Sequence, residues 1–473
     1  MALSKYERDF CGPSERTKRV LNDEETIACR SEVMRVIDVG SPHFLFTPNE
    51  QEPLVNGKPV QLPNLAKLFA SFVPFGQSLV FAFKNVAEFA PLIEDLLEQR
   101  WPTYGEVLLR HSVRIVPCAE TEYQLSGGSF AGVRLSLVDE QRWEISKMIR
   151  RDFGDVDADV RLLAEGKFIS NLPPQAARLF PKVRPEDVIE ENGKVGYRME
   201  YCPFPTIAEL VLAGHITPEQ TVEFLAGIYD AMFTRVYCIP EDGGKKDDDY
   251  FSRIDRRMER VLATPDHVGQ RLKTLLRAEE LTIDGKKYPG FRSLYERLSQ
   301  NDNYRKLVLP PDHCVAHGDM ILEDILLQPY SAEFRLIDPN SRSHSRYYDL
   351  AKTFLSLATK YELFYFERFS LEYEKQDPTD INIVFDDPEM AETYDEMCEN
   401  FWSFLEKHAG QFFKEEPEWK DRLMLLNGLQ NLAIVMFHLI RHNREDRAIA
   451  FLLMGIKQLS SFFKAQNRNP VQP

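Results

Sequence analysis

The sequence lacks several features that would define a protein class at once. Its 473 residues include 7 cysteines, which form no Cys-x-x-Cys pair and no spacing typical of metal ligands. An odd, scattered set of cysteines favours reduced thiols, so we expect a cytoplasmic protein. The 23 glycines and 29 prolines are dispersed. This dispersal excludes collagen-like and low-complexity chains.

The chain also lacks an excess of positive charge. It has 58 Lys and Arg against 74 Asp and Glu, which gives a formal net charge of -16. A nucleic acid or an anionic membrane attracts clustered cations, so we expect neither as a general partner. A nucleotide needs only a few local donors, and the net charge therefore leaves nucleotide binding open. The composition does not indicate an oligomeric state.

Long hydrophobic runs are scarce. The first ten residues, MALSKYERDF, have no apolar stretch after their charges, so no secretory signal is predicted. The most apolar window, 423–440, contains Asn427, Gln430 and Asn431. A membrane span requires about 20 nearly uninterrupted apolar residues. The window therefore predicts a buried helix.

A chain of this length exceeds one ordinary domain. The pattern predicts three regions: a small α/β accessory domain over 1–118, a β-rich region over 119–204 and a helical region over 205–473. In the first region we expect a crossover unit. Its predicted elements are a helix from Asp23 to about Val36, a strand over 78–83, a helix over 88–99 and a strand over 107–116.

The second region predicts a sheet with one helix, and the third predicts mainly helices. The expected elements of the second region are strands over 133–138, 143–147 and 197–201 and a helix over 160–169. Capping boxes, in which Ser or Thr is followed three residues later by Glu or Gln, begin at Thr206 and Thr217. Helices are then expected over most of 250–300 and 350–463, with a break near 375–388.

The most informative pattern surrounds a short predicted hairpin. Two apolar runs, Ile325–Leu327 and Phe334–Ile337, are separated by a turn-rich connection. Asp324 immediately precedes the first run and Asp338 immediately follows the second. Antiparallel neighbours lie only about 5 Å apart, so we expect these carboxylates to converge. Asp319, five residues before Asp324, is expected near the same end.

Three carboxylates gathered in a partly buried site repel one another unless a cation compensates. Mg²⁺ fits that need because it takes oxygen ligands, typically one or two carboxylates together with substrate phosphates. The third carboxylate could then orient or deprotonate an attacking hydroxyl, as phosphoryl transfer requires. Each aspartate alone is equally an ordinary loop residue. The set, with His317 and Gly318, favours a phosphotransfer site.

The segments His317-Gly-Asp319, Ile337-Asp338 and Tyr348-Asp349-Leu-Ala-Lys352 resemble the aminoglycoside phosphotransferase/choline kinase family. The resemblance covers roughly 120–460. It implies an α+β, two-lobed, protein-kinase-like fold, with a β-rich small lobe over 119–204 and a helical large lobe over 205–473 that carries the catalytic loop.

The same resemblance implies a role for each of these residues. Asp319 would be the catalytic aspartate facing the acceptor hydroxyl, and Asp338 the principal metal ligand. His317 and Asp349 would brace the catalytic loop. Asp349 could equally cap the helix that follows it, and both roles can hold together.

One position departs from the family pattern, because the family normally has Asn where this chain has Asp324. Aspartate binds Mg²⁺ at least as readily, so Asp324 remains a candidate metal ligand. The same departure is also what a non-catalytic member would show.

Upstream residues match the nucleotide-binding elements of the family. A glycine-rich turn would cover the phosphates, a strand lysine would contact them, and a helix glutamate would pair with that lysine. The interlobe hinge would bind adenine through its backbone. The matching residues are Gly127, Gly128, Ser129, Lys147, Glu165, Glu200 and Tyr201.

The sequence therefore predicts an ATP- and Mg²⁺-dependent phosphotransferase acting on a hydroxyl of a small molecule, such as a sugar, an amino alcohol or an aminoglycoside. One alternative is a non-catalytic nucleotide-binding or scaffold protein on the same fold. A second is a bifunctional sugar-nucleotide enzyme. Residues 51–59 faintly resemble sugar nucleotidyltransferases, although the glycine- and arginine-rich nucleotide loop is missing.

Two further groups of residues are interpreted as structural. His438 and His442 are spaced i, i+4 without an accompanying acid, so we expect core histidines. The aromatic run over 361–369 is expected to pack along one helix.

Overall fold

The chain divides into two compact units. The first comprises Met1–Leu172, Ala177–Thr217 and Ile325–Ile337, and the second Pro173–Ala176, Pro218–Asp324 and Asp338–Pro473. The computed structural model describes short strands before residue 126 and then 131–139, 142–149, 158–191, 194–202, 204–240, 250–265, 267–309, 313–328, 332–340, 345–374, 377–413 and 416–468.

Two small sheets are formed by the N-terminal strands. The first has the order β1-β4-β5, with β1 Ile27–Cys29, β4 Pro53–Val55 and β5 Lys58–Pro59. The second has the order β2-β3-β6-β7, with β2 Met34–Asp38, β3 Pro42–Phe46, β6 Leu79–Ala82 and β7 Arg114–Ile115. The strand predicted over 78–83 is confirmed as β6.

Two predictions for this region are wrong. The helix expected from Asp23 to Val36 is replaced by β1 and β2, and β2 pairs antiparallel with β3. The β-branched Val36 and Ile37 favour extended backbone, and β3 supplies the hydrogen-bonding partner. The expected crossover unit fails because β6 and β7 pair antiparallel, whereas a crossover joins parallel strands. The helix expected over 88–99 lies outside the described residues.

The next part of the first unit is a five-stranded antiparallel sheet of order β11-β12-β10-β9-β8. Its strands are β8 Tyr123–Leu125, β9 Ala131–Asp139, β10 Arg142–Ile149, β11 Val188–Glu191 and β12 Lys194–Glu200. Helix α6, Ala158–Asn171, connects β10 to β11 across the 3-10 turn η2, Pro185–Asp187, and packs against β12. The strands and the helix predicted over 133–201 are confirmed.

The predicted hairpin is also confirmed, as β15 Ile325–Gln328 and β16 Glu333–Leu336, with Ile325 opposite Leu336. The Leu327 N–H donates to the Pro205 carbonyl at 2.8 Å. Helix α8, Ile207–Leu212, comes shortly after Pro205 in the chain and begins with the predicted capping box. In it the Glu209 N–H donates to Thr206 Oγ1 at 3.1 Å, and the Thr206 N–H donates to Glu209 Oε2 at 2.8 Å.

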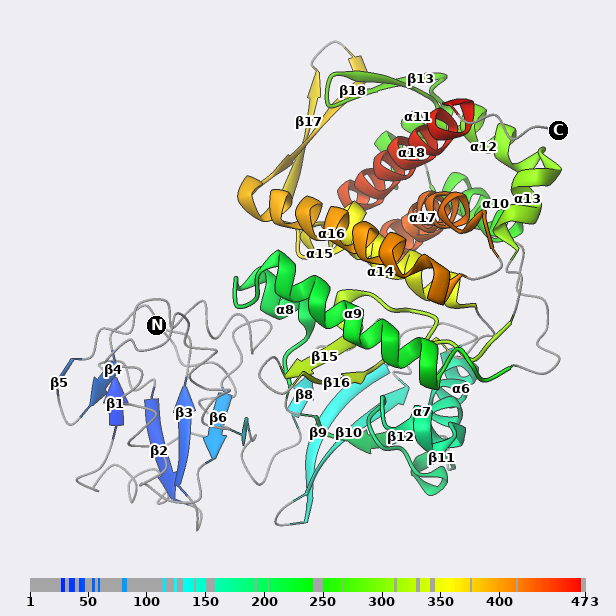
Figure 1. Ribbon diagram of the computed structural model, residues 1–473. Coiled ribbons are helices and arrows are strands. Elements are labelled where there is room, and N and C mark those ends of the chain that lie inside the picture. Colours follow the sequence, from blue (N-terminus) through cyan, green and yellow to red (C-terminus); the bar gives the residue numbers. More distant parts are fainter. Residues whose placement is uncertain are drawn as a thin grey trace. The chain divides into compact units, whose positions relative to one another are not determined.

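The second unit is mainly helical (Figure 1). Its helices are α9 Pro218–Arg235, α10 Tyr250–Leu262, α11 Gln270–Arg277, α12 Phe291–Ser299, α13 Asp302–Val308, α14 Arg346–Thr359, α15 Tyr361–Tyr365, α16 Pro388–Phe412, α17 Trp419–Met436, the π-helical turn η4 Phe437–Arg441 and α18 Glu445–Arg468. Helix α17 packs against α18, α14 and α10. Gly428 allows close approach, because a Cβ there would lie 2.5 Å from Leu459.

Two helical stretches of this unit, Trp419–Arg441 and Glu445–Gln466, are long and apolar enough to cross a membrane. In the folded chain 78% and 72% of their most apolar windows are buried inside the protein. The interpretation of the window at 423–440 as a buried helix is therefore confirmed.

A four-stranded sheet of order β14-β13-β18-β17 interrupts the helices and corrects two predictions. Its strands are β13 Glu280–Ile283, β14 Lys286–Pro289, β17 Phe369–Glu374 and β18 Asp377–Phe385. The first pair, β13 and β14, lies within 250–300, most of which was expected to be helical. Asp284 and Gly285, with φ of 50° and 70°, form the turn, and Asp-Gly is a strong hairpin signal. Phe369 belongs to β17, so the aromatic run does not lie on one helix.

The predicted α+β class is confirmed, since an antiparallel sheet with one packed helix precedes a mainly helical region.

Candidate active site

The His-Gly-Asp loop is held by one carboxylate beneath it. His317 and Asp349 are both completely buried. Asp349 accepts hydrogen bonds from the His317 N–H at 2.9 Å, the Gly318 N–H at 2.6 Å and the Tyr237 hydroxyl at 3.0 Å. Burial raises the pKa of Asp349 to about 7, while these donors oppose that shift by favouring the ionised form. Asp349 therefore fixes the backbone of the loop.

This geometry tests both roles predicted for Asp349. Helix α14 begins at Arg346 with Ser345 as its N-cap, so Asp349 lies inside the first turn. The prediction that Asp349 caps the helix is wrong. The contacts to the loop are those expected of a bracing residue.

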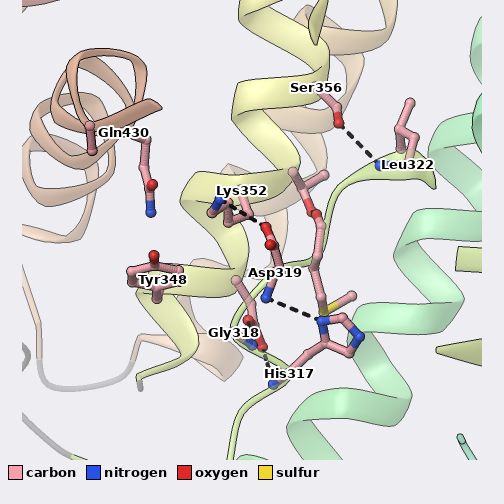
Figure 2. Close-up of polar contacts among 12 residues, drawn as sticks. His317, Gly318, Asp319, Leu322, Tyr348, Lys352, Ser356 and Gln430 are labelled. Atoms are coloured by element: carbon pink, nitrogen blue, oxygen red, sulfur yellow. Dashed lines mark hydrogen bonds and ion pairs between the residues drawn. The ribbon is translucent and has the colours of Figure 1, made fainter. Parts of the chain in front are cut away.

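The loop itself needs glycine at its centre. Gly318 has a φ of 82°, in the left-handed region where a side chain is strained. The Asp319 N–H donates to His317 Nδ1 at 3.2 Å, which ties the two ends of the turn together (Figure 2). In this bond Nδ1 of His317 is the acceptor.

One face of α14 contacts successive residues of the loop. Residues 349, 352, 353 and 356 are spaced i, i+3, i+4 and i+7, which places them on the same side of a helix. Thr353 Oγ1 donates to the Met320 carbonyl at 2.8 Å. Ser356 Oγ accepts from the Leu322 N–H at 3.1 Å (Figure 2). The loop is thereby fixed over its length, and Asp319 is carried on a rigid support.

Asp319 pairs with Lys352, whose Nζ lies 2.8 Å from Asp319 Oδ1 (Figure 2). The lysine side chain is 10% exposed and the aspartate side chain 35% exposed. Burial opposes the charge on Lys352, but Asp319 and Tyr348 outweigh it, so the pKa of Lys352 is raised. The lysine is therefore charged at neutral pH, and the aspartate keeps access to solvent.

The two candidate metal ligands lie at the ends of the predicted hairpin. Asp324 ends the 3-10 turn η3, Leu322–Asp324, directly before β15. Asp338 follows β16 by two residues and has a φ of 58°, a left-handed conformation that Asp tolerates better than most residues. The Asn340 N–H donates to the His317 carbonyl at 2.8 Å, which ties the segment after Asp338 to the His-Gly-Asp loop.

Within the described ranges, no three His, Cys, Asp or Glu side chains come together as a metal site. The expected tight gathering of three carboxylates is therefore not found there. The cation that compensates Asp319 is Lys352. Asp324 and Asp338 remain two oxygen donors, which is the number that Mg²⁺ commonly takes from a protein when phosphates supply the rest.

The first unit contains a second buried ion pair, predicted from the family resemblance. Lys147 Nζ on β10 lies 2.8 Å from Glu165 Oε1 on α6. The Tyr197 hydroxyl on β12 donates to the same oxygen at 2.5 Å. Gly166 allows this packing, because a Cβ there would lie 2.9 Å from Tyr197. A strand lysine fixed by a helix glutamate is the arrangement with which protein kinases position phosphates.

The other candidate nucleotide-binding residues are placed in part. Gly127, Gly128 and Ser129 lie outside the described residues. Glu200 ends β12, and its Oε2 accepts from the Lys182 N–H at 3.2 Å. Tyr201 follows it, and burial raises the pKa of its hydroxyl well above the ordinary value.

Three contributors were missed from the sequence. Tyr197, Thr353 and Ser356 were not predicted, and Lys352 was noted only as part of a matching segment. The spacing from Asp349 was an available signal, since positions i+3, i+4 and i+7 of a helix share a face. Tyr197 gave no such signal, because its contact depends on the register of β12.

The expectation of core histidines is confirmed for His438 but not for His442, which is half-buried and directly follows the π-helical turn η4. His438 is completely buried in η4, where its ring stacks on Phe451 with 4.5 Å between centroids. Burial lowers the pKa of His438 well below its ordinary value.

The chain is similar to known proteins in structure but not detectably in sequence family. No family model and no curated protein matches the chain. A choline kinase, LicA from Streptococcus pneumoniae, is 14% identical over 72% of this chain and 93% of its own, with a TM-score of 0.43. An aminoglycoside 2'-phosphotransferase in its GDP complex is 10% identical over 75% and 94%, with a TM-score of 0.39. A glucosamine kinase is 11% identical over 74% and 94%, with a TM-score of 0.36.

The chain's own topology agrees with the protein-kinase-like fold. A five-stranded antiparallel sheet carries the lysine on β10, and the helix that follows that strand carries its glutamate partner. A mainly helical unit then carries the His-Gly-Asp loop.

Proposed function

We propose that the protein is a small-molecule kinase that transfers the γ-phosphoryl group of ATP to a hydroxyl. The observation that carries this proposal is the support of Asp319. Its loop is fixed by the buried Asp349 and by α14, while 35% of its own side chain is exposed. Phosphoryl transfer depends mainly on positioning, and a carboxylate held in this way can orient a hydroxyl.

In the proposed reaction the acceptor hydroxyl hydrogen-bonds to Asp319 Oδ2, because Oδ1 is engaged by Lys352. The acceptor oxygen forms the new bond to the γ-phosphorus, and the bond from that phosphorus to the leaving ADP oxygen breaks. The hydroxyl proton passes to Asp319 as the new bond forms. Lys147, held by Glu165 and Tyr197, is assigned to the phosphates of the nucleotide.

The proposal assigns a magnesium ion to Asp324 and Asp338, whose carboxylates are the ligand type that Mg²⁺ prefers. Asp324 and Asp338 supply two carboxylates next to a fixed loop, and nucleotide phosphates supply further oxygen ligands. When bound, the ion would neutralise charge on the phosphates.

The proposal is tested by replacing the catalytic carboxylate. Asp319→Ala should lower kcat by at least about 10³-fold, because the group that orients the hydroxyl is lost. The nucleotide dissociation constant should stay within about threefold of the wild-type value. The residues assigned to the nucleotide are unchanged, and Asp319 is assigned to the acceptor. Transfer is measured with radiolabelled ATP against sugars, amino alcohols and aminoglycosides.

Asp395→Ala is the matched control. Asp395 also pairs with a lysine, Lys360, but its side chain is 63% exposed on α16. This variant should retain wild-type turnover. Full turnover in Asp319→Ala would refute the assignment.

A second candidate, a non-catalytic nucleotide-binding protein, is favoured by one observation. Asp324 stands where the resembling family has Asn, and an added carboxylate changes the charge that a metal and phosphates meet. Saturable binding of ATP with Mg²⁺, without transfer to any acceptor of the panel, would support this candidate.

A further inference from the structure

We propose that Lys352 is the positioning residue of Asp319, a role that rests on the proposed function. Lys352 holds one carboxylate oxygen so that the other faces the acceptor hydroxyl. The pair is direct, with 2.8 Å between Lys352 Nζ and Asp319 Oδ1 (Figure 2).

The lysine is itself rigidly placed. It lies on α14 three residues after Asp349, so the helix that fixes the loop backbone also carries the cation. Its side chain is 10% exposed, and its Nζ lies 5.9 Å from the centre of the Tyr348 ring, close enough for a cation–π contact. A buried lysine loses less rotamer freedom on pairing than an exposed one.

Further polar contacts order the surroundings of the lysine. The Tyr348 hydroxyl accepts from Arg253 Nη1 on α10 at 3.2 Å, and Gln430 Nε2 on α17 donates to the Tyr250 hydroxyl at 2.6 Å. These contacts join α10 to α14 through Tyr348, the residue beside Lys352, and α17 to α10. The aspartate is the more exposed partner of the pair, as a group that meets a substrate must be.

The ion pair with Lys352 restricts the orientation of the Asp319 carboxylate. A free aspartate rotates about χ1 and χ2, and in solution either oxygen could meet the hydroxyl. The ion pair with Lys352 favours one of these arrangements. Misplacement of a reacting group by about 1 Å can cost about 10²-fold in rate. Lys352 acts through Asp319, so its loss should lower kcat and leave nucleotide binding intact.

The test compares Lys352→Met, Lys352→Arg and Lys360→Met in phosphate transfer. Lys352→Met should lower kcat by about 30-fold or more, with KM for ATP within about twofold. Lys352→Arg keeps the charge and should recover at least about tenfold of the loss. Lys360→Met is the matched control, because Lys360 is also buried, follows the same helix and pairs with Asp395. It should keep wild-type kcat.

A second measurement is independent of turnover. Melting temperatures of Lys352→Met, Asp319→Asn and the double variant form a cycle. If the pair exists, the double variant should melt higher than the sum of the single shifts predicts, because neither charge is then left alone.

The outcomes separate the two proposals. A wild-type chain without transfer to any acceptor refutes the proposed function and this role with it. An active wild type with unchanged kcat in Lys352→Met refutes the positioning role alone. Additive melting shifts refute the ion pair. A fall in kcat that Lys352→Arg does not relieve also counts against the role, because the charge would then be irrelevant.

Discussion

The two units each contain a lysine paired with a carboxylate at 2.8 Å, but the pairs are built in opposite ways. In the first unit, Lys147 and Glu165 are 6% and 10% exposed, and Tyr197 donates a second hydrogen bond to the carboxylate. In the second unit, Lys352 is 10% exposed and Asp319 is 35% exposed. In the first pair both side chains are therefore buried, whereas in the second pair only the lysine is.

This difference indicates which group each pair serves. A fully buried pair fixes geometry, and removing one partner leaves an uncompensated charge in the interior. A pair with one exposed carboxylate leaves that group available for a further contact. We infer that Glu165 serves to position Lys147, whereas Lys352 serves to position Asp319.

The largest expected effect is a difference between the two ion pairs in how much each contributes to the free energy of unfolding. Lys147→Met strands the Glu165 carboxylate, so the free energy of unfolding should fall by about 3–5 kcal/mol. Lys352→Met leaves a carboxylate that water can reach, and the fall should be about 1 kcal/mol. Urea unfolding followed by circular dichroism measures both. Equal losses would contradict the proposed difference between the pairs.

The next prediction concerns a buried carboxylate that supports the second unit's loop. Glu362 accepts from Ser356 Oγ at 2.7 Å, and Ser356 holds the Leu322 N–H. Burial raises the pKa of Glu362 from its usual 4.5 to about 7. The folded state thus binds this proton more tightly than the unfolded state. The stabilisation is complete below about pH 4.5 and is lost as pH rises through 7.

Glu362→Gln should therefore remove part of the pH dependence of stability. Between pH 5 and pH 8 the wild type should lose up to about 3 kcal/mol more than the variant. Other buried carboxyls, including Asp349, titrate alike in both proteins, so the difference isolates residue 362. Parallel stability curves across this pH range would show that Glu362 does not carry the effect.

The smallest expected effect tests the tyrosine that distinguishes the first pair. Tyr197→Phe removes one hydrogen bond to Glu165 and keeps the ring. The free energy of unfolding should fall by about 1.5–3 kcal/mol, as for a bond to a charged group. Glu165 then holds Lys147 less firmly, so ATP affinity should fall by a few fold. Isothermal titration measures this, with Tyr295→Phe, which loses a hydroxyl bond to the Phe251 carbonyl, as the control. An unchanged affinity in Tyr197→Phe would assign the tyrosine to stability alone.

Local patterns predicted much of the fold. The strands around Lys147, the helix carrying Glu165 and the hairpin at Ile325 were each specified by alternation or helical spacing over a few residues. The sheet that joins β13 to β18 could not be derived in this way. These strands are almost a hundred residues apart in sequence, and their pairing, Ile283 with Ile381, is decided by tertiary contacts.

The candidate site shows the same division. His317, Asp319 and Asp349 were predicted because they occupy recognisable positions in short segments. The partner of Asp319 was not, because an ion pair depends on the angle at which a helix meets a loop. The tight set of three carboxylates was expected from hairpin geometry, but that geometry fixes strand ends and leaves side-chain directions open.

Helix α14 sets a limit on how this sequence can vary in length. Its loop contacts come from residues 349, 352, 353 and 356, which share a face only in the present register. Inserting or deleting one residue between 349 and 352 would rotate the later positions by about 100° around the helix axis. Such a change would detach Asp319 from its cation while the helix itself remained intact. We therefore expect insertions and deletions in this segment of α14 to harm the site far more than substitutions on the opposite face of the helix.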